Sequence, residues 1–292
     1  MSNINYSFII PHKNRPDLLL RCINTIPRRK DVQIIIVDDN SDSDIVDFEH
    51  FPGINEECVE VYFTKEGRGA GYARNVGLKY AQGNWLLFAD ADDYYASNFI
   101  EILDEKLSED LDILYFNVFS NDCTIYNRAI AINEIYQLYF ESHDEEIIKY
   151  KVWAPWNKVI SLRLINKYHL KFDEIPVGND AIFMLQASRL ACNVKVILEK
   201  LYCITYQTDS ITYRKMTFER QLSYAKINLR INNFFQKNHL SKYQITIISP
   251  KFILSLVKEY GFINTFEYLR YVNQKDNLIH LFYIWFRRKY LM

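Results

Sequence analysis

Short apolar runs alternate with amphipathic stretches along the first 95 residues. The apolar runs have the length of strands and comprise Tyr6–Ile10, Gln33–Val37, Val59–Phe63 and Trp85–Ala89. Between them, apolar residues recur at helical spacing from Pro16 to Ile26 and from Ala70 to Ala81. Strands that alternate with helices at this spacing build βαβ units. The pattern therefore predicts an α/β fold with a mostly parallel sheet flanked by helices.

The rest of the chain changes character twice. After residue 95, the pattern of apolar residues predicts a helix over about 97–108 and a strand over Ile113–Val118. It also predicts helices near Leu162–Tyr168 and 180–191, and strands near 194–198 and 201–206. The stretch up to about residue 150 is mixed, and from Phe218 onward the pattern is helical and aromatic. We therefore expect one domain over 1–217, with halves at about 1–95 and 96–217, followed by a helical C-terminal region over 218–292.

The composition is that of an ordinary globular protein. Of the 292 residues, 49% are apolar and 24% are charged. The five cysteines are an odd number without a C-x-x-C pair, so we expect a reducing compartment rather than a disulfide framework or a cysteine zinc site. No apolar run approaches the roughly 20 residues of a spanning helix, and the N-terminal residues lack the apolar core of a signal peptide. The expected location is the cytoplasm.

Charge is divided unevenly between the two regions. Residues 218–292 hold 12 Lys and Arg against 4 Asp and Glu, whereas the first 217 residues hold 23 against 32. One interpretation is an amphipathic lid that lies on the anionic inner face of a membrane, with Leu281–Phe286 inserted and Arg287, Arg288 and Lys289 at the headgroups. The other is a subdomain that packs on the first domain. Nucleic acid is not an expected partner, because the cations are spaced out and no recognition motif occurs.

Carboxylates follow two of the predicted strands. Asp38 and Asp39 end the second strand, and Asp90, Asp92 and Asp93 come directly after the fourth. Because open parallel sheets bind ligands at the carboxyl ends of their strands, we expect these groups to converge on one edge. Asp90 and Asp92 can share a divalent cation with phosphate oxygens and water, or they can form a solvated turn. Asp38 or Asp39 can accept a hydrogen bond from a uracil imide or a ribose hydroxyl, or can cap a helix.

Four of the eight glycines lie between residues 67 and 77. Their spacing is neither G-x-G-x-x-G nor that of a P-loop, so neither a dinucleotide fingerprint nor a P-loop is expected. The cluster can still bring backbone amides and the cations of Arg68 and Arg74 close to an anionic ligand. The alternative is a flexible loop that precedes a capped helix.

Two positions in the second half add candidate chemistry. Trp156 follows Pro155, and its indole suits either stacking on the apolar face of a sugar or anchoring in the core. Asp180 precedes the apolar helix Ala181–Leu190, so it is first a helix cap candidate. It also offers the general base that the other motifs lack, and we expect the helix N-terminus to keep it ionised near neutral pH.

Taken together, the motifs resemble a known family. They occur in the order Ile10–Arg15, Val37–Ser41, Gly71–Gly77, Phe88–Asp93, Trp156–Lys158 and Asn179–Asp180. This set is similar to that of family 2 glycosyltransferases, which have the GT-A fold, a Rossmann-like sheet flanked by helices. The resemblance covers about residues 5–215, and residues 218–292 would form a helical extension.

The resemblance implies an inverting glycosyltransferase with a nucleotide-diphosphate sugar as donor, UDP-sugar favoured, and Mg²⁺ or Mn²⁺ as cofactor. The acceptor would be a hydroxyl of a glycan or lipid-linked molecule in bacterial surface polysaccharide synthesis. Contacts to the nucleotide sugar would come from Pro11, Asp38, Asp39, Arg74, Asp90 and Ala91. Asp92 with Asp90 would hold the metal, Asp180 would be the catalytic base, and Trp156 and Asn179 would lie on the acceptor side. Asn179 stands where the family has Glu.

Two other functions stay open from the sequence. Sugar nucleotidyltransferases also have paired carboxylates and an α/β fold. They usually carry a Gly-rich signature with a Lys near the first strand, and in this chain Lys13 alone does not provide that signature. A degenerate binding module would keep the fold without the reaction. The intact carboxylates Asp39, Asp90, Asp92 and Asp180 argue against such a module.

Overall fold

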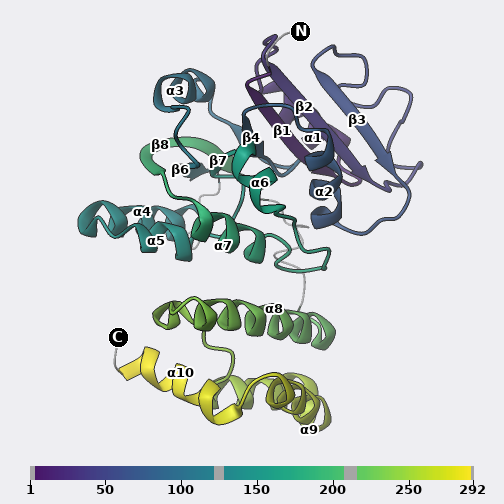
Figure 1. Cartoon of the computed structure of the whole chain (residues 1–292). Helices are drawn as coiled ribbons and strands as arrows, with labels where there is room; N and C mark the ends of the chain where they lie inside the picture. Colours follow the sequence, from purple (N-terminus) through teal and green to yellow (C-terminus); the bar gives the residue numbers. More distant parts are fainter. Residues whose placement is uncertain (1–3, 122–127, 207–215, 291–292) are drawn as a thin grey trace. The chain divides into compact units, whose positions relative to one another are not determined.

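The computed structural model describes residues 4–121, 128–206 and 216–290. The chain forms two compact units. The first comprises residues 1–175 and 179–208, and the second comprises 176–178 and 209–292. The first unit is an α/β domain and the second is helical (Figure 1).

An eight-stranded sheet forms the centre of the first unit (Figure 1). Its strands lie in the order β3-β2-β1-β4-β7-β6-β8-β5. Their bounds are β1 Tyr6–His12, β2 Val32–Asp39, β3 Val59–Thr64, β4 Trp85–Phe88, β5 Tyr94–Tyr95, β6 Ile113–Ser120, β7 Lys158–Ser161 and β8 Val194–Ile204. Strands β1 to β4 are the four strands that the sequence predicted for the first 95 residues, and they lie side by side.

The sheet is mixed in direction. The pairs β1–β2, β2–β3, β1–β4 and β6–β8 are parallel, whereas β7 runs antiparallel to β4 and β6, and β5 antiparallel to β8. The two strands expected near 194–198 and 201–206 are one continuous strand, β8. The polar pair Glu199 and Lys200 suggested a break, but a register irregularity opposite Asn117 accommodates it within the ladder.

Apolar side chains cover both faces of the sheet. Ile10, Ile34 and Ile36 belong to one core, and their strand neighbours Ile9 and Ile35 belong to the other. The first core receives side chains of α1 (Pro16–Asn24) and α3 (Phe99–Lys106), and the second receives those of α2 (Ala70–Tyr80), α6 (Leu162–Tyr168) and α7 (Ala181–Leu190). Because both faces are buried, these strands appear in the sequence as continuous apolar runs.

The mixed stretch before residue 150 contains two helices. These are α4 (Arg128–Ser142) and α5 (Glu145–Lys151), and the side chain of Asp144 caps the second by accepting from the Glu146 amide at 2.9 Å. Ala129 and Tyr136 are the buried residues of α4. Ile132, Ile135, Tyr139 and Phe140 also pack against the core but are only partly buried, so the helix has no sharp division between an apolar and a polar face and its pattern in the sequence is weak.

The second unit consists of α8 (Phe218–Lys237), the short 3₁₀ helix η2 (Ser241–Tyr243), α9 (Pro250–Lys275) and α10 (Leu278–Tyr290). Ser249 caps α9 by accepting from the Phe252 amide at 3.1 Å, and α9 bends at Gly261, whose φ is +81°. The unit has its own apolar core, which includes Ala225, Ile248, Leu256, Tyr268, Val272, Leu281 and Ile284.

This core corrects the expectation that Leu281–Phe286 inserts into a membrane as one segment. Leu281 and Ile284 are fully buried in the unit because they lie on the face of α10 that packs against its neighbours. The guanidinium groups of Arg287 and Arg288 donate to the carbonyl oxygens of Ser241 and Gln244. Among the described helices, none is long and apolar enough to cross a membrane.

Candidate active site

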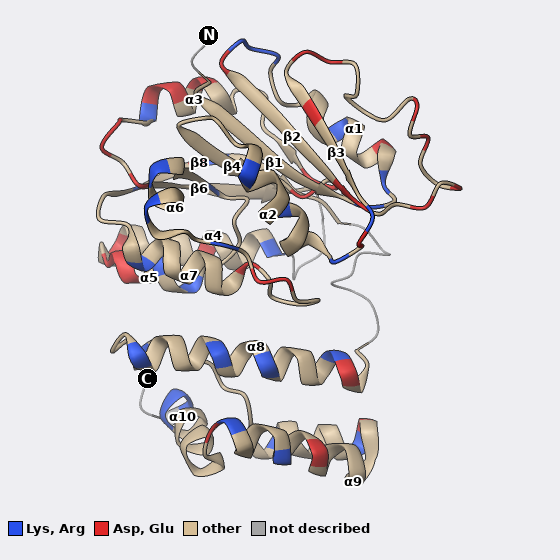
Figure 2. Ribbon diagram, turned by 45° about the vertical axis from the view of Figure 1, so that its right-hand side comes forward, with Lys and Arg blue, Asp and Glu red and all other residues tan. Residues whose placement is uncertain are grey.

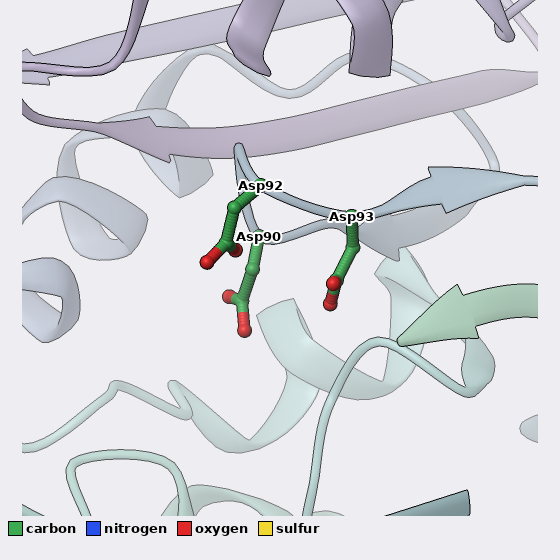
Figure 3. Close-up of side chains that lie close together, drawn as sticks. All are labelled: Asp90, Asp92 and Asp93. Carbon is green, nitrogen blue, oxygen red and sulfur yellow. The ribbon is translucent and has the colours of Figure 1, made fainter. Parts of the chain in front are cut away.

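Three carboxylates cluster in the loop that follows β4. Asp90, Asp92 and Asp93 each offer an oxygen, and these oxygens all lie within 4.8 Å of one another (Figure 3). Asp93 is buried, and Asp90 and Asp92 are partly exposed. Burial raises the pKa of Asp92 and that of Asp93, and the negative charge of Asp90 raises both further.

This donor set fits a divalent cation. Carboxylate oxygens are the ligands that Mg²⁺ and Mn²⁺ prefer, and three of them crowded together repel one another without a cation between them. Asp90 and Asp92 are the two residues that the sequence assigned to the metal. Asp93 shares the cluster, but its Oδ1 accepts from the Thr205 amide at 2.7 Å, so it also holds the loop to the chain after β8.

The backbone of the acidic loop is fixed from two sides. The Asp90 amide donates to the Tyr202 hydroxyl at 2.9 Å, and Tyr202 lies on β8. The Asp92 carbonyl accepts from the Arg21 guanidinium of α1 at 2.5 Å and from the Thr205 hydroxyl. The carboxylates are therefore held in place by residues that are distant in the sequence, which favours a preformed site.

Arg74 of α2 joins this loop to the segment before α7. Its Nη2 donates to Asp90 Oδ1 at 2.7 Å, and its Nη1 donates to Asn179 Oδ1 at 2.8 Å. The guanidinium is buried and lies over the Phe172 ring, 5.4 Å from the ring centroid. Arg74 thus connects a predicted nucleotide-sugar residue with a predicted acceptor residue, and its predicted approach to the nucleotide stays a prediction.

Asp180 lies at the start of α7 but does not cap it. Its side chain makes no capping hydrogen bond, so the structure does not support the alternative that Asp180 serves only as a helix cap. Burial raises the pKa of Asp180, and the Arg74 charge opposes this rise. Burial thus acts against the expected effect of the helix N-terminus, and the ionisation of Asp180 near neutral pH stays a prediction. A partly exposed carboxylate with a raised pKa is a stronger base than an ordinary one.

Gly71 allows α2 to approach the segment that carries Asn179. A Cβ at Gly71 would lie 2.0 Å from the carbonyl oxygen of Asp173 and 3.0 Å from Asn179 Cβ. The first distance leaves no room for any side chain. The glycine cluster therefore serves here as a packing surface against the Asn179–Asp180 segment, a role that the sequence alone did not indicate.

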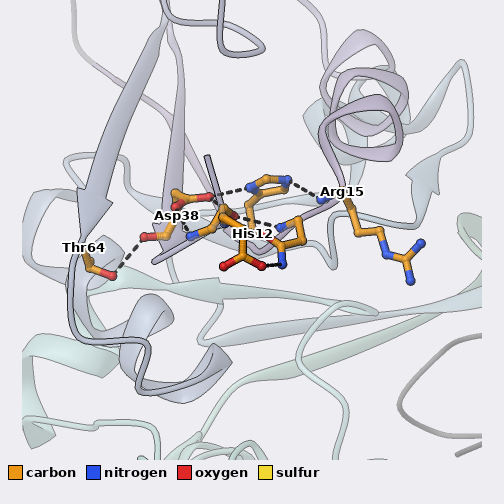
Figure 4. A network of polar contacts seen from close by, with 7 residues as sticks. His12, Arg15, Asp38 and Thr64 are labelled. Carbon is orange, nitrogen blue, oxygen red and sulfur yellow. Dashed lines mark hydrogen bonds and ion pairs between the residues drawn. The ribbon is translucent and has the colours of Figure 1, made fainter. Parts of the chain in front are cut away.

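The two aspartates that end β2 are engaged by protein groups, and Figure 4 shows the network around Asp38. Asp38 is 1% exposed, its Oδ2 lies 2.7 Å from His12 Nδ1, and it accepts from the amide and hydroxyl of Ser41 at 2.9 and 2.6 Å. Burial alone would raise the pKa of Asp38, but the His12 and Ser41 hydrogen bonds lower it. This placement opposes the predicted nucleotide contact of Asp38 and instead ties β1 to β2.

Asp39 positions the glycine-rich loop. Its two carboxylate oxygens accept from the amides of Arg68 and Gly69 at 3.0 and 2.7 Å. Pro11 is partly exposed at the end of β1, and Ala91 is buried against the core in the acidic loop. Thus Pro11, Asp39 and the acidic loop all lie at the carboxyl ends of β1, β2 and β4, as the parallel pairing predicted.

Trp156 is an anchor in the core. It is 2% exposed, and its ring stacks on Tyr202 with a centroid distance of 5.3 Å and an interplanar angle of 7°. This placement favours the buried alternative and leaves little of the ring for an acceptor sugar. Its aromatic stack instead supports Tyr202, whose hydroxyl accepts from the Asp90 amide.

Two cations near the site had no assigned role in the sequence. Lys158, at the start of β7, is fully buried and donates to the Ala154 carbonyl and Asn157 Oδ1 at 2.6 and 2.7 Å. Burial lowers the pKa of Lys158, and the Asp180 charge opposes this. Arg128, at the start of α4, lies over the Trp156 ring. Lys158 belongs to the motif Trp156–Lys158, which was identified in the sequence. Arg128 belongs to no motif, so no pattern in the sequence assigned it to the site.

Comparison with known proteins decides the family. A model of the family described as Glycosyl transferase family 2 matches residues 7–167, which is more than half of the chain. The chain belongs to glycosyl transferase family 2. The matched range includes the acidic loop, Arg74 and Lys158, and Asp180 lies beyond it.

A curated relative and a solved structure are also similar to this chain. "Uncharacterized glycosyltransferase EpsJ" of Bacillus subtilis is 28% identical over 228 residues, which are 70% of this chain and 62% of EpsJ, so the chain spans less than two thirds of that relative. The crystal structure of S. aureus TarS 1-349 in complex with UDP-GlcNAc has a TM-score of 0.67 at 19% identity and covers 94% of this chain and 84% of that chain.

A second solved structure extends the comparison. "Mannosyltransferase PcManGT from Pyrobaculum calidifontis in complex with GDP-Man and Mn2+" has a TM-score of 0.56 at 10% identity and covers 95% of this chain and 85% of that chain. Both likenesses concern the fold, and this family 2 chain has the GT-A fold with additional C-terminal helices.

Proposed function

We propose that this family 2 chain transfers a sugar from a nucleotide-diphosphate sugar to a hydroxyl group, with inversion at the anomeric carbon and a divalent metal as cofactor. The observation that carries the proposal is the clustered carboxylates of Asp90 and Asp92, joined through Arg74 to the segment of Asn179 and Asp180. Residues 1–217 would form the catalytic domain, with the nucleotide-sugar half over about 1–95 and the acceptor half over about 96–217.

In this proposal each residue has one task. Asp92 and Asp90 would hold Mg²⁺ or Mn²⁺, which when bound supplies positive charge to the donor diphosphate. Asp180 takes the proton of the acceptor hydroxyl, whose oxygen forms the new bond to the anomeric carbon. The bond to the diphosphate breaks on the opposite face, and its electron pair leaves with the diphosphate. Attack opposite to the leaving group inverts the anomeric centre.

The related structures support the choice of donor. TarS was solved with UDP-GlcNAc and PcManGT with GDP-Man and Mn²⁺, so both bind nucleotide-diphosphate sugars. We favour a UDP-sugar for this chain, because its fold is more similar to that of TarS. The acceptor would be a glycan or lipid-linked molecule of bacterial surface polysaccharide, in keeping with the bacterial relative EpsJ.

Product analysis tests the proposal. The protein is incubated with a panel of nucleotide sugars and Mn²⁺, and the nucleotide products are separated. Release of a nucleoside diphosphate that stops on addition of EDTA supports a metal-dependent transferase. A parallel incubation with nucleoside triphosphates and sugar 1-phosphates tests the alternative, because a sugar nucleotidyltransferase would release pyrophosphate from those substrates. A donor that binds but is never turned over, with acceptors or with water, would indicate a binding module.

The pH dependence of transfer should follow Asp180. Groups that face it include Arg74 of α2, Arg128 of α4, Lys158 of β7 and Asp90 of the acidic loop. Because burial raises the pKa of Asp180, this base takes up a proton at a higher pH than an ordinary carboxyl group. We expect the transfer rate to fall, as the pH drops, before exposed carboxylates titrate.

The measurement is the transfer rate across the acid range with saturating donor and acceptor. Recovery of the rate on return to neutral pH excludes unfolding as the cause. A rate that stays constant down to the pKa of an exposed aspartate would contradict the assignment of Asp180 as the base.

We further propose that the second unit contacts an anionic membrane through α10. Ile279, Tyr283 and Phe286 recur at positions i, i+4 and i+7, and their side chains are 78%, 54% and 47% exposed. They lie opposite the buried Leu281 and Ile284, so α10 is apolar on both faces. Lys and Arg outnumber Asp and Glu over 218–292, as Figure 2 shows for the helices of this unit. An apolar stripe on a basic helical unit suits an anionic bilayer.

A double variant tests this surface. Ile279→Ser with Phe286→Ser should weaken binding to phosphatidylglycerol vesicles at least tenfold, because burying one such side chain contributes about 1.5–3 kcal/mol. Salt should weaken binding by the unsubstituted protein. The matched control is Leu198→Ser, which removes an exposed apolar side chain from β8 of the first unit.

Vesicle cosedimentation measures the effect, and light scattering reports the oligomeric state. Equal vesicle binding by the double variant and the control would contradict the membrane role of this stripe. If the stripe instead pairs two copies of the chain, the unsubstituted protein will be a dimer and the double variant a monomer. Arg287 and Arg288 are unsuitable for the test, because their hydrogen bonds stabilise the unit itself.

A further inference from the structure

Arg128 stands on an aromatic stack that leads to the acidic loop. Its guanidinium carbon lies over the Trp156 ring at 5.4 Å from the centroid, and Trp156 stacks on Tyr202. The Tyr202 hydroxyl accepts from the Asp90 amide at 2.9 Å. Two packed aromatic rings therefore join the cation to the loop of the clustered carboxylates. Contact between a guanidinium and an indole face fixes the position of the charge.

The backbone that carries Arg128 is held firmly. The next residue, Ala129, is buried in the core of the sheet domain. About two turns further along α4, the Tyr136 hydroxyl donates to the Phe116 carbonyl at 2.6 Å and accepts from Asn157 Nδ2 at 3.2 Å. The start of α4 is therefore anchored on β6 and on the residue before β7, while Arg128 itself is exposed.

Other arginines near the site are occupied by protein groups. Arg74 donates to Asp90 and Asn179, and Arg21 donates to the Asp92 carbonyl. For Arg128, the described residues supply the Trp156 ring but no hydrogen bond or ion pair to the guanidinium. Its five N–H donors thus remain available to a ligand.

Arg128 lies near both sides of the proposed reaction. On the donor side, the aromatic stack beneath its guanidinium leads to the backbone of Asp90 in the acidic loop. On the acceptor side, its charge reaches Asp180, the proposed base, where it opposes the rise in pKa that burial causes.

We propose that Arg128 binds the diphosphate of the nucleotide-sugar donor and stabilises the charge that develops there as the sugar leaves. The inference rests on the proposed function and adds a catalytic residue to it. When the bond between the anomeric carbon and the phosphate oxygen breaks, its electron pair stays on that oxygen. A planar guanidinium can donate two parallel hydrogen bonds to phosphate oxygens, and the buried Trp156 keeps it aligned before substrate arrives.

Binding of UDP and of uridine separates this role from a structural one. Calorimetry with Mn²⁺ should show Arg128→Gln to bind UDP about tenfold or more weakly, while its affinity for uridine is unchanged. The transfer rate at saturating donor should fall about 100-fold, the scale observed when one donor to a developing charge is removed. Arg128→Lys keeps the charge and should lie between the two proteins in UDP affinity.

The matched control is Arg163→Gln. Arg163 is exposed in the same unit and pairs with Asp112, so its removal should leave UDP affinity and transfer unchanged. Melting temperatures show whether each variant is folded. If Arg128→Gln does not fold, the comparison is made with Arg128→Lys, whose UDP affinity must then fall below that of the unsubstituted protein.

Three outcomes would overturn the inference. Unchanged UDP affinity in the variant excludes a diphosphate contact. An increase in the KM for the acceptor alone, with donor affinity intact, would place Arg128 on an anionic group of the acceptor. An equal loss of uridine and UDP affinity would mean that the variant disturbs the pocket as a whole. Failure of the unsubstituted protein to bind any nucleotide sugar would instead contradict the proposed function.

Discussion

Replacement of Asp180 by Asn should lower the transfer rate about 100-fold or more and leave the affinities for donor and metal nearly unchanged. Asn has almost the same shape as Asp but cannot take a proton from the acceptor hydroxyl. The side chain makes no capping hydrogen bond to α7, so the substitution removes little from the stability of the helix. The loss should therefore appear in the chemical step.

The measurement combines donor affinity by calorimetry with the transfer rate at a saturating acceptor concentration. Asp110→Asn is a matched control, because Asp110 is exposed in the same unit and accepts a hydrogen bond only through its backbone carbonyl. If the rate of Asp180→Asn survives, the base lies elsewhere. If donor affinity collapses together with the rate, Asp180 belongs to the nucleotide or metal site.

Replacement of Asp92 by Ala should abolish turnover and metal-dependent nucleotide binding. Asp92 shares the cluster with Asp90 and Asp93, and without it the remaining carboxylates would bind a divalent cation weakly. The fold should persist, because burial and the Asp90 charge already disfavour the ionised form of Asp92. We therefore expect a metal-free melting temperature at least equal to that of the unsubstituted protein.

Thermal shift measurements with UDP test this expectation, with Mn²⁺ or with EDTA. The unsubstituted protein should be stabilised by UDP and Mn²⁺ together, whereas Asp92→Ala should show no metal-dependent increment. Exposed Asp42→Ala, outside the cluster, should behave like the unsubstituted protein. Full activity of Asp92→Ala, or of the unsubstituted protein in EDTA, would contradict the metal assignment.

Much of the first half of the fold could be predicted, because its signals are local. The strands β1, β2, β3 and β4 are apolar runs of strand length, and their parallel pairing places Asp39 and Asp90 at one edge. The antiparallel insertion of β7 between β4 and β6 could not be predicted, since it depends on pairings between segments far apart in the sequence.

The roles of individual site residues were less accessible, because each depends on what packs around it. Asp38 is engaged by His12 at the end of β1 and by Ser41 after β2, and no local sequence pattern predicts that contact. The pKa of Asp180 depends on how much water the surrounding residues remove, which a position at a helix start does not reveal. Arg128 gains its place near the site only because Trp156 is buried beneath it.

The C-terminal helices show a related difficulty. A helical and aromatic pattern was enough to predict a helical region over 218–292, which the structure divides into α8, α9 and α10. It could not show which apolar side chains of α10 face the core, because both faces of that helix are apolar. Leu281 and Ile284 are buried inside the unit, whereas Ile279 and Phe286 are exposed.

The bridge formed by Arg74 makes the two halves of the site thermodynamically dependent on each other. Asp90, which would help to hold the metal, accepts from Arg74, and Arg74 also donates to Asn179 on the proposed acceptor side. If metal binding changes the affinity for the acceptor, acceptor binding must change the affinity for the metal by the same factor. Any such coupling would act through a single guanidinium shared between the acidic loop and the Asn179 segment.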